Sequence, residues 1–246
     1  MPRPPGPAPE PGASSASGYR AVLRDRRYLL FVAIRVNFVF TALVLSLLFA
    51  AYITTGLHRQ AWIAAALLVF NGAQAALTQT SVTRWLQRFP PVRVIGGSAL
   101  LNALAFGLFA AVGAAPAWLV LAGLSVGMLL YNFAETAAAP FTEELSVSLA
   151  PEHMRGRYLA VCQLAWTFGQ TAAPAVFTLL LTEGAAWPWV FLIALNLAAV
   201  PALLLLERRI GVRPADRYSG SRSGRLASTW SPEDSPRSRR PTQGSR

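Results

Sequence analysis

The chain has 246 residues, of which 54% are hydrophobic and only 13% are charged, and its mean hydropathy is +0.41. A soluble domain usually carries about 25% charged residues, so this composition indicates a membrane protein. The formal net charge of +11 is spread over short connectors and a tail, which argues against a folded nucleic-acid-binding face. The single cysteine, Cys162, excludes a disulfide framework within the chain and a multi-cysteine metal site.

The two ends of the chain differ from its middle. Residues 1–18 are rich in Pro, Gly, Ser and Ala and cannot bury enough apolar surface to fold, so they are predicted to be a disordered linker. Residues 212–246 are rich in Ser, Arg and Pro and lack an apolar period, which predicts a disordered basic tail. The tail arginines can lie against anionic lipid, or the tail can simply be solvated. Residues 19–211 are predicted to form one membrane domain.

This middle region contains six apolar runs, each long enough to cross about 30 Å of hydrocarbon as a helix. Strands are excluded because the runs are continuous, whereas strands of a membrane barrel alternate apolar and polar residues. The fold class is therefore an all-α membrane protein. The predicted helices are 28–54, 61–82, 92–113, 116–139, 158–181 and 187–206.

Arginines are unevenly distributed among the connectors. Several precede the first helix, follow the sixth, and lie between helices two and three and between helices four and five. Arg59 is the only arginine between helices one and two, and the other two connectors have none. Because connectors on the cytoplasmic side carry an excess of Arg and Lys, both termini are predicted to be cytoplasmic in a multi-pass protein of the cytoplasmic (inner) membrane.

Polar residues in the helices repeat with a period of three helices. The first and fourth helices carry a charge, the second and fifth carry a stripe of amides and hydroxyls at helical spacing, and the third and sixth are nearly bare. Three is odd, so the second triplet crosses in the opposite direction, which predicts the inverted 3+3 repeat of many secondary transporters. The alternative is that scattered amides serve helix packing. The stripes are Asn71, Gln74 and Thr78 in the second helix, and Gln163, Thr167 and Gln170 in the fifth.

Arg35 and Glu135 are the only ionisable residues well inside the predicted helices, and they lie at similar depths. An unpaired charge at the centre of a bilayer costs about 2.5–3.5 kcal/mol. We hypothesise that the two side chains face one cavity and pair, and that with Asn37 and Asn132 they bind a substrate or a coupling ion. The alternative is that Arg35 reaches the headgroups and Glu135 caps a neighbouring connector.

The stretch from Glu135 to Pro174 resembles a known family. It contains Pro140, then Leu-Ala-Pro-Glu ending at Glu152, and then Arg-Gly-Arg-Tyr ending at Tyr158. This pattern is similar to the tenth helix, connector and eleventh helix of major facilitator superfamily transporters, near their drug:proton antiporter branches.

The connectors add to this resemblance. The connector with Arg84 and Arg88 resembles the loop between the family's eighth and ninth helices, although it lacks that loop's acidic residue and following glycine. These two arginines, together with Arg155, Gly156 and Arg157, form the predicted cytoplasmic loop motif.

The resemblance implies that the six helices are the C-terminal half of a twelve-helix carrier, with the two amide-striped helices facing the other half. It implies efflux of a small molecule coupled to protons, no cofactor, and the lipid bilayer as surroundings. Since only half of the fold is present, we expect a truncated or split product that needs a second six-helix half or a second copy. The alternative is a membrane interaction or scaffold protein without transport, or an inactive remnant.

Intramembrane enzymes are disfavoured by the residues that are absent. His58 and His153 both lie in connectors, so no helix offers a histidine base to a serine protease. No aspartate lies between Asp25 and Asp216, which removes the metal-binding aspartates of an alcohol phosphotransferase and the His and Asp ligands of a cation-diffusion transporter. We therefore expect no enzyme activity and no bound metal.

Overall fold

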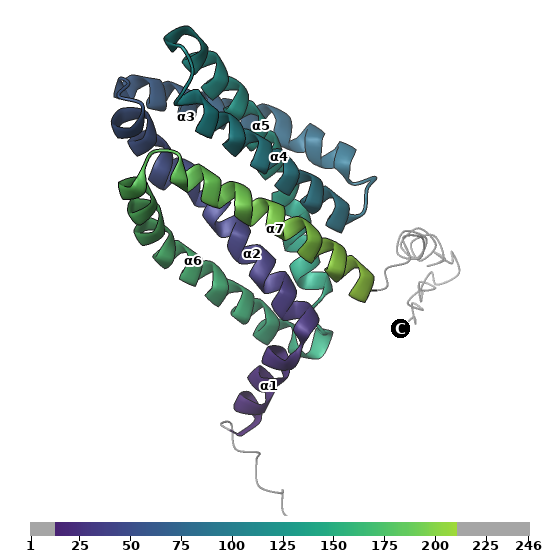
Figure 1. The fold of residues 1–246 in the computed structure, drawn as a ribbon. Coiled ribbons are helices and arrows are strands. Elements are labelled where there is room, and N and C mark those ends of the chain that lie inside the picture. Colours follow the sequence, from purple (N-terminus) through teal and green to yellow (C-terminus); the bar gives the residue numbers. More distant parts are fainter. Residues whose placement is uncertain (1–12, 211–246) are drawn as a thin grey trace, which may run out of the picture. The chain divides into compact units, whose positions relative to one another are not determined.

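The computed structural model describes residues 13–210, and within them every regular element is a helix (Figure 1). Six of these helices are long and apolar enough to cross a membrane, so the predicted all-α fold with six spans is confirmed. Two π-helical segments, Leu45–Phe49 and Tyr52–Gly56, extend the first span, and a short 3-10 helix, Glu152–Met154, precedes the fifth. The α-helices are α1 (Ala13–Arg24), α2 (Arg26–Val44), α3 (Ala61–Leu86), α4 (Pro91–Val112), α5 (Ala117–Ser148), α6 (Arg155–Glu183) and α7 (Trp187–Ile210).

Helix α1 lies partly in the segment that the sequence predicted to be a linker. The last proline before it is Pro11. Every residue of α1 therefore has a backbone N–H group that can donate to a helical hydrogen bond. Val22 is fully buried in the apolar core, which fixes this helix to the bundle. Residues 1–12 of the predicted linker and the predicted tail at 212–246 lie outside the described residues.

The start of α2 is fixed by a short polar network. Asp25 caps the helix by accepting hydrogen bonds from the backbone N–H groups of Arg27 and Tyr28, at 3.0 and 3.2 Å. The hydroxyl of Tyr158, at the start of α6, donates to the other carboxylate oxygen of Asp25 at 3.2 Å. The hydroxyl of Tyr28 donates to the carbonyl oxygen of Tyr158 at 2.6 Å. Tyr158 of the Arg-Gly-Arg-Tyr segment therefore joins the beginnings of two spans.

Helix α5 runs through Pro140 to Ser148, past its predicted end at residue 139. A proline inside a helix removes one backbone hydrogen bond, but membrane helices tolerate this where neighbouring groups compensate. Phe141 and Leu145 are buried in the same apolar core as Ala137, so packing holds the extra turns in place. The predicted connector after Pro140 is therefore the last part of a span.

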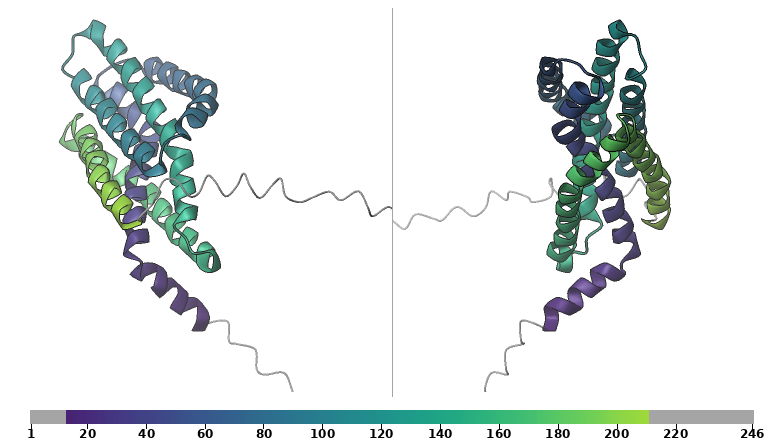
Figure 2. Two further views of the ribbon diagram at one scale, coloured as in Figure 1. Left: turned by 90° about the vertical axis from the view of Figure 1, so that its right-hand side faces the viewer. Right: turned by 60° about the vertical axis from the view of Figure 1, so that its left-hand side comes forward.

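The helices pack unevenly. Helix α4 lies between α5 and α7, α2 packs against α6 and α7, and α3 packs mainly against α5 at the edge of the bundle (Figure 2). Only 11% of the most apolar part of α3 and 17% of that of α6 is buried, against 33% or more in each other span. Helices α3 and α6, the second helix of each triplet, are thus the least buried spans.

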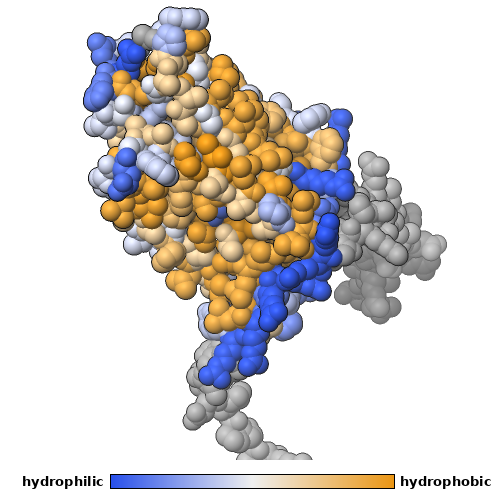
Figure 3. Space-filling view, viewed as in Figure 1, coloured by the Kyte–Doolittle hydropathy of each residue, from blue (hydrophilic) through white to orange (hydrophobic). Residues whose placement is uncertain are grey.

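Two apolar cores fill the bundle. One gathers Phe40, Phe49, Phe106, Tyr131 and Trp189, and lies toward the end where α2 finishes. The other gathers residues near the start of α2, the start of α4 and the end of α5. The outer surface is also largely apolar, and hydrophilic residues gather toward its ends (Figure 3). Such a surface suits contact with hydrocarbon.

Gly169 allows the close approach of α6 to α2. A Cβ atom added at Gly169 would lie 2.7 Å from Cγ1 of Val39 and 3.0 Å from its Cβ, whereas one added at Gly72 on α3 would meet nothing within 4 Å. Small residues at helix contacts let backbones approach closely. Gly169 thus lets α6, from the second triplet, pack closely against α2, from the first.

We expect Gly169→Leu to lower the stability of the bundle by about 1–3 kcal/mol, because the larger side chain must push α6 away from α2. Gly72→Leu is the matched control and should leave the melting temperature nearly unchanged. Thermal unfolding of the purified chain in detergent, followed by size-exclusion chromatography, measures both. Equal melting temperatures for the two variants would contradict the close contact.

Candidate functional site

A layer of buried polar side chains crosses the bundle between the two apolar cores. Its members come from α2, α4, α5 and α7. In α4, α5 and α7 they fall between residues of one core and residues of the other, and in α2 they lie on both sides of the point where one core gives way to the other. Polar groups at this depth have no water to bond to, so they must find partners in the protein or face an aqueous cavity. The polar layer consists of Arg35, Asn37, Thr41, Asn102, Asn132, Glu135, Thr136 and Asn196.

Glu135 is the acidic member of this layer. The Nδ2 atom of Asn102, which is fully buried on α4, donates to Oε1 of Glu135 at 3.1 Å. A hydrogen bond from a neutral amide holds the carboxyl group in place without neutralising it. No ion pair to Glu135 occurs among residues 13–210. Its carboxyl group can therefore gain or lose a proton without breaking a salt bridge.

Asn132, three residues earlier on α5, joins a different helix. Its Nδ2 atom donates to the backbone carbonyl of Asn71 at 2.8 Å, and its Oδ1 atom accepts from Thr136 at 3.3 Å. The Nε2 atom of Gln74 donates to the carbonyl of Leu129 at 3.3 Å. The side-chain amide of Gln74 and the backbone carbonyl of Asn71, two predicted interface residues of the second helix, thus join α3 to α5 within this chain.

A third group of hydrogen bonds joins α2, α5 and α7. Nδ2 of Asn196 donates to Oγ1 of Thr41 at 3.1 Å, and the hydroxyl of Tyr131 donates to the carbonyl of Thr41 at 3.2 Å. Thr41 and Asn196 are fully buried. The sequence showed both residues but gave no reason to prefer them to other isolated polar residues.

Arg35 pairs with Glu143 on the extension of α5. The side chain of Arg35 is 10% exposed and that of Glu143 is 65% exposed, so the pair reaches from the interior toward the surface. The guanidinium carbon also lies 5.6 Å from the ring centre of Trp166 on α6, in the range of a cation–π contact. The Nε atom of Arg35 is buried and has no hydrogen-bond partner in the protein.

Arg35 and Glu135 line one cavity of about 160 Å³, and Glu143, Trp166 and Thr142 complete most of its polar wall. The hypothesis that Arg35 pairs with Glu135 is corrected by the structure, because its ion pair is with Glu143. The physical reason is the length of α5. The extra turns beyond Pro140 bring a second carboxylate to the level of Arg35, near the start of α2. This cavity is called the central cavity below.

Several amide oxygens of the polar layer are buried without a donor. Oδ1 of Asn102, Oδ1 of Asn196 and both side-chain amide atoms of Asn37 have no hydrogen-bond partner in the protein, and Asn37 is only 5% exposed. A buried polar atom without a partner is costly, so such atoms indicate a place for water or a bound ion. Amide and carboxylate oxygens are the ligands that hard cations prefer.

The remaining predicted site residues lie away from the polar layer. Gln163, Thr167 and Gln170 are exposed on α6, and Thr78 is half-buried on α3. The loop arginines Arg84, Arg88 and Arg155 are exposed at helix ends, and Arg157 is half-buried. A Cβ atom added at Gly156 would meet nothing within 4 Å, so no close contact requires a glycine there. The structure therefore groups Arg35, Asn37, Asn132 and Glu135 in one layer and leaves the others at the periphery.

Sequence reasoning missed Glu143 and Trp166. A signal for Glu143 was present, because Phe141, Leu145 and Leu149 recur every four residues after Pro140 and continue the apolar face of a helix. The proline was given more weight than this period. For Trp166 no signal existed, since a tryptophan in an apolar run is ordinary and its position beside Arg35 depends on tertiary packing.

The chain is similar to a known antiporter and to a known transporter family. The chain is 31% identical over 188 residues to the "Na(+), Li(+), K(+)/H(+) antiporter" of Planococcus maritimus. The match covers 71% of this chain but only 43% of that protein, so the chain spans less than half the length of this curated relative. A family model described as Major Facilitator Superfamily matches residues 28–238, which include all six spans. This six-helix chain therefore belongs to the Major Facilitator Superfamily.

Proposed function

We propose that the chain forms one six-helix bundle of a secondary transporter that exchanges a small cation for protons across the cytoplasmic membrane. The observation that carries this proposal is the half-buried carboxyl group of Glu135, which lines the central cavity and is hydrogen-bonded by Asn102 without an ion pair among the described residues. An exchanger needs a group that takes either a proton or the transported ion, and an intramembrane carboxylate can do both.

The substrate class follows from two observations. The matched Planococcus protein is described as an antiporter of sodium, lithium and potassium ions. The polar layer of this chain offers amide oxygens of Asn37, Asn102 and Asn196 that lack donors, and the Asn102 side chain is hydrogen-bonded to the carboxylate of Glu135. Oxygen ligands of this kind favour a hard cation, so an alkali cation fits better than a lipophilic drug. Export from the cell is the direction that we propose.

A second bundle is part of the proposal. Alternating access in this class of transporter requires two bundles to rock against each other around a central site. The chain covers only 43% of its relative, which leaves room for a second bundle in the longer protein. The exposed face of α6, with Gln163 and Gln170, and the little-buried α3 are the surfaces that we assign to it. The partner is a separate six-helix half or a second copy of this chain.

We expect sodium or potassium ions to release protons in vesicles that contain an active carrier. In inverted membrane vesicles with a pre-formed pH gradient, addition of either salt should collapse the gradient, as measured with a pH-sensitive dye. Glu135→Gln should lower this response by about 100-fold, because the amide cannot carry a proton. Glu144→Gln, on an exposed position of the same helix, is the matched control and should respond like the unchanged chain.

The same assay distinguishes the partners. Exchange by this chain alone indicates a homodimer, and exchange only with the unmatched part of the Planococcus antiporter co-expressed indicates a split carrier. A lack of exchange in both arrangements, with the protein folded and inserted, would contradict the transport proposal and favour a scaffold role.

Replacing Glu143 should lower the stability of the bundle more than replacing its ion-pair partner Arg35. Glu143→Gln leaves a buried guanidinium without its anion and should lower stability by about 1–3 kcal/mol. Arg35→Met leaves a largely exposed carboxylate, which water can solvate, and should cost less. Thermal unfolding in detergent measures both, with Glu144→Gln as control. A larger loss from Arg35→Met would mean that the packing of Arg35 on Trp166 matters more than its charge.

We also expect both termini to be cytoplasmic. A green fluorescent protein fused to the C-terminus should fluoresce, because it folds only on the cytoplasmic side. Alkaline phosphatase inserted after Arg59, in the connector between α2 and α3, should be active because that connector lies outside. The opposite pattern would reverse the orientation inferred from the arginine distribution.

A further inference from the structure

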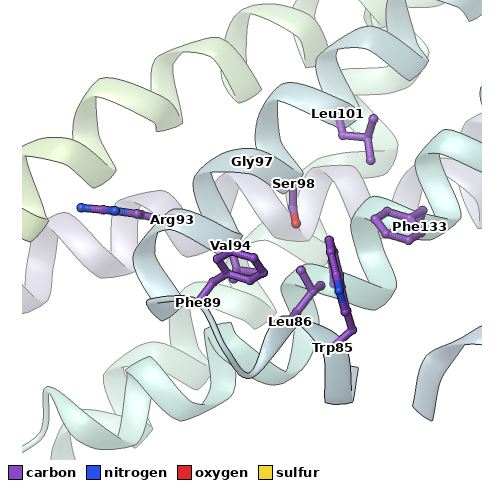
Figure 4. Close-up of a pocket in the computed structure, with 10 residues that line it drawn as sticks. Trp85, Leu86, Phe89, Arg93, Val94, Gly97, Ser98, Leu101 and Phe133 are labelled. Atoms are coloured by element: carbon purple, nitrogen blue, oxygen red, sulfur yellow. The ribbon is translucent and has the colours of Figure 1, made fainter. Parts of the chain in front are cut away.

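A second cavity, of about 290 Å³, lies at the other side of the bundle, where α3, the connector to α4, and α5 meet. This connector cavity is lined by Trp85, Phe89, Val94, Leu101 and Phe133, with Ser98 and Arg93 as its polar members (Figure 4). It shares no residue with the central cavity. The transport proposal gives it no role.

The connector cavity lies at one end of the membrane-spanning region. Helix α2 starts at this end and crosses to the other, α3 returns, and α4 begins again at Pro91. Trp85 and Phe89 form one wall and contact each other edge to face, with ring centres 5.6 Å apart. They are 52% and 46% exposed, and aromatic residues at this level are typical of the interface between headgroups and hydrocarbon.

Beyond Leu101, the last α4 residue that lines the cavity, α4 presents further exposed apolar residues. Gly97, Leu101 and Leu104 follow at i, i+4 and i+7, and Leu100 and Leu104 are more than half exposed. In Figure 4 the side chains of Trp85, Phe133 and Leu101 border one space, and the hydroxyl of Ser98 points into it. An apolar tail can therefore enter the cavity and leave along α4 into the bilayer.

Arginines lie next in sequence to the residues that line the cavity. Arg84, in the last turn of α3, precedes Trp85, and Arg88 precedes Phe89; both arginines are exposed and have no ion pair among the described residues. Arg93 extends outward from the cavity in Figure 4, and its 3.5 Å contact with Glu207 is the one ion pair that the structure gives it. The connector from Arg84 to Arg93 contains no acidic residue. A phosphate group near these arginines would meet no carboxylate of the connector itself.

We propose that the connector cavity binds an anionic membrane phospholipid. One acyl chain occupies the apolar space between Trp85, Leu101 and Phe133, and the phosphate lies at Arg84, Arg88 and Arg93. The combination of an apolar cavity, an aromatic wall and three arginines at one end of the spans, two of them without an ion pair among the described residues, fits a molecule with a tail and an anionic head. A free anion has no tail to fill the apolar space. An uncharged apolar compound has no group that binds the arginines.

Photo-crosslinking of the full chain in lipid nanodiscs tests this site. The probe is phosphatidylglycerol with a photoactivatable group in its acyl chain, and the crosslinked peptides are identified by mass spectrometry. We expect crosslinks within residues 85–101 or 133–137, which line the cavity, and unlabelled phosphatidylglycerol should compete about tenfold better than phosphatidylcholine. Crosslinks elsewhere, equal competition by the two lipids, or displacement by sodium phosphate alone would overturn the proposal. Displacement by an uncharged apolar compound as effective as phosphatidylglycerol would also overturn it.

Two pairs of variants test the apolar space and the charge of the site separately. A Cβ atom at Gly97 or at Gly107, both on α4, would meet nothing within 4 Å, but only Gly97 lines the cavity. Gly97→Leu should fill the cavity and lower the crosslinking yield by about fivefold or more, whereas Gly107→Leu should leave it within about twofold. Equal yields from these two variants would contradict the site.

The second pair concerns the charge. Replacement of Arg84 and Arg88 by Gln should remove the preference for phosphatidylglycerol over phosphatidylcholine, whereas Arg59→Gln in a different connector should not. An unchanged preference in the double variant would mean that the arginines do not hold the phosphate. The mapping and competition need no variant, so they decide the proposal even where Gly97→Leu does not fold.

Discussion

Hydrocarbon offers no hydrogen bonds, and this constraint arranges the whole bundle. Apolar side chains can lie anywhere in the six spans, but each amide or charge has to meet a partner from another helix. The structure meets this need by placing such residues in one layer between two apolar cores. Asn102 meets Glu135, Asn196 meets Thr41, and Asn132 meets the backbone of α3. The layer thus connects α2, α3, α4, α5 and α7 at one depth.

Helix α5 contributes both carboxyl groups that line the central cavity, and its length decides how they differ. Because the helix continues beyond Pro140, Glu143 reaches Arg35 and neutralises it. Glu135 is then left with a neutral amide partner. If the helix had ended at the proline, Glu135 would have been the nearest anion for Arg35 and would have been held as a salt bridge. A carboxylate held in that way exchanges protons poorly, so the extension of α5 is what leaves Glu135 available.

The sequence predicts the parts of this fold that depend on one helix at a time. Six apolar runs give six spans, because the length of a run alone decides whether it crosses the bilayer. The buried positions of Arg35, Asn37 and Asn132 and the half-buried position of Glu135 also follow, since a polar residue in the middle of a span is costly where it contacts lipid. Their partners depend on how the helices rotate and shift against each other. The residue pattern of a single helix does not show this.

The two amide-striped helices show this limit clearly. Asn71 and Gln74 lie on the same helix and at similar spacing to the stripe of α6, so the sequence treats both stripes alike. In the structure they contact α5, while the exposed side chains of Gln163 and Gln170 have no hydrogen bond to any described residue. The difference arises because α3 packs along α5, whereas only one side of α6 meets α2. Periodicity identifies a polar face, but it does not say which neighbour covers that face.

The need for a second bundle rests on fewer residues than the stripes imply. The hydroxyls of Thr167, Thr171 and Thr178 on α6 each donate to the carbonyl four residues earlier, at 2.7–3.1 Å. A threonine satisfied in this way can face lipid at little cost. A glutamine has a larger amide that its own helix does not satisfy, so Gln163 and Gln170 are costly in hydrocarbon unless another protein surface or water covers them. These two glutamines, and not the hydroxyls beside them, are therefore the residues on which the proposed second bundle depends.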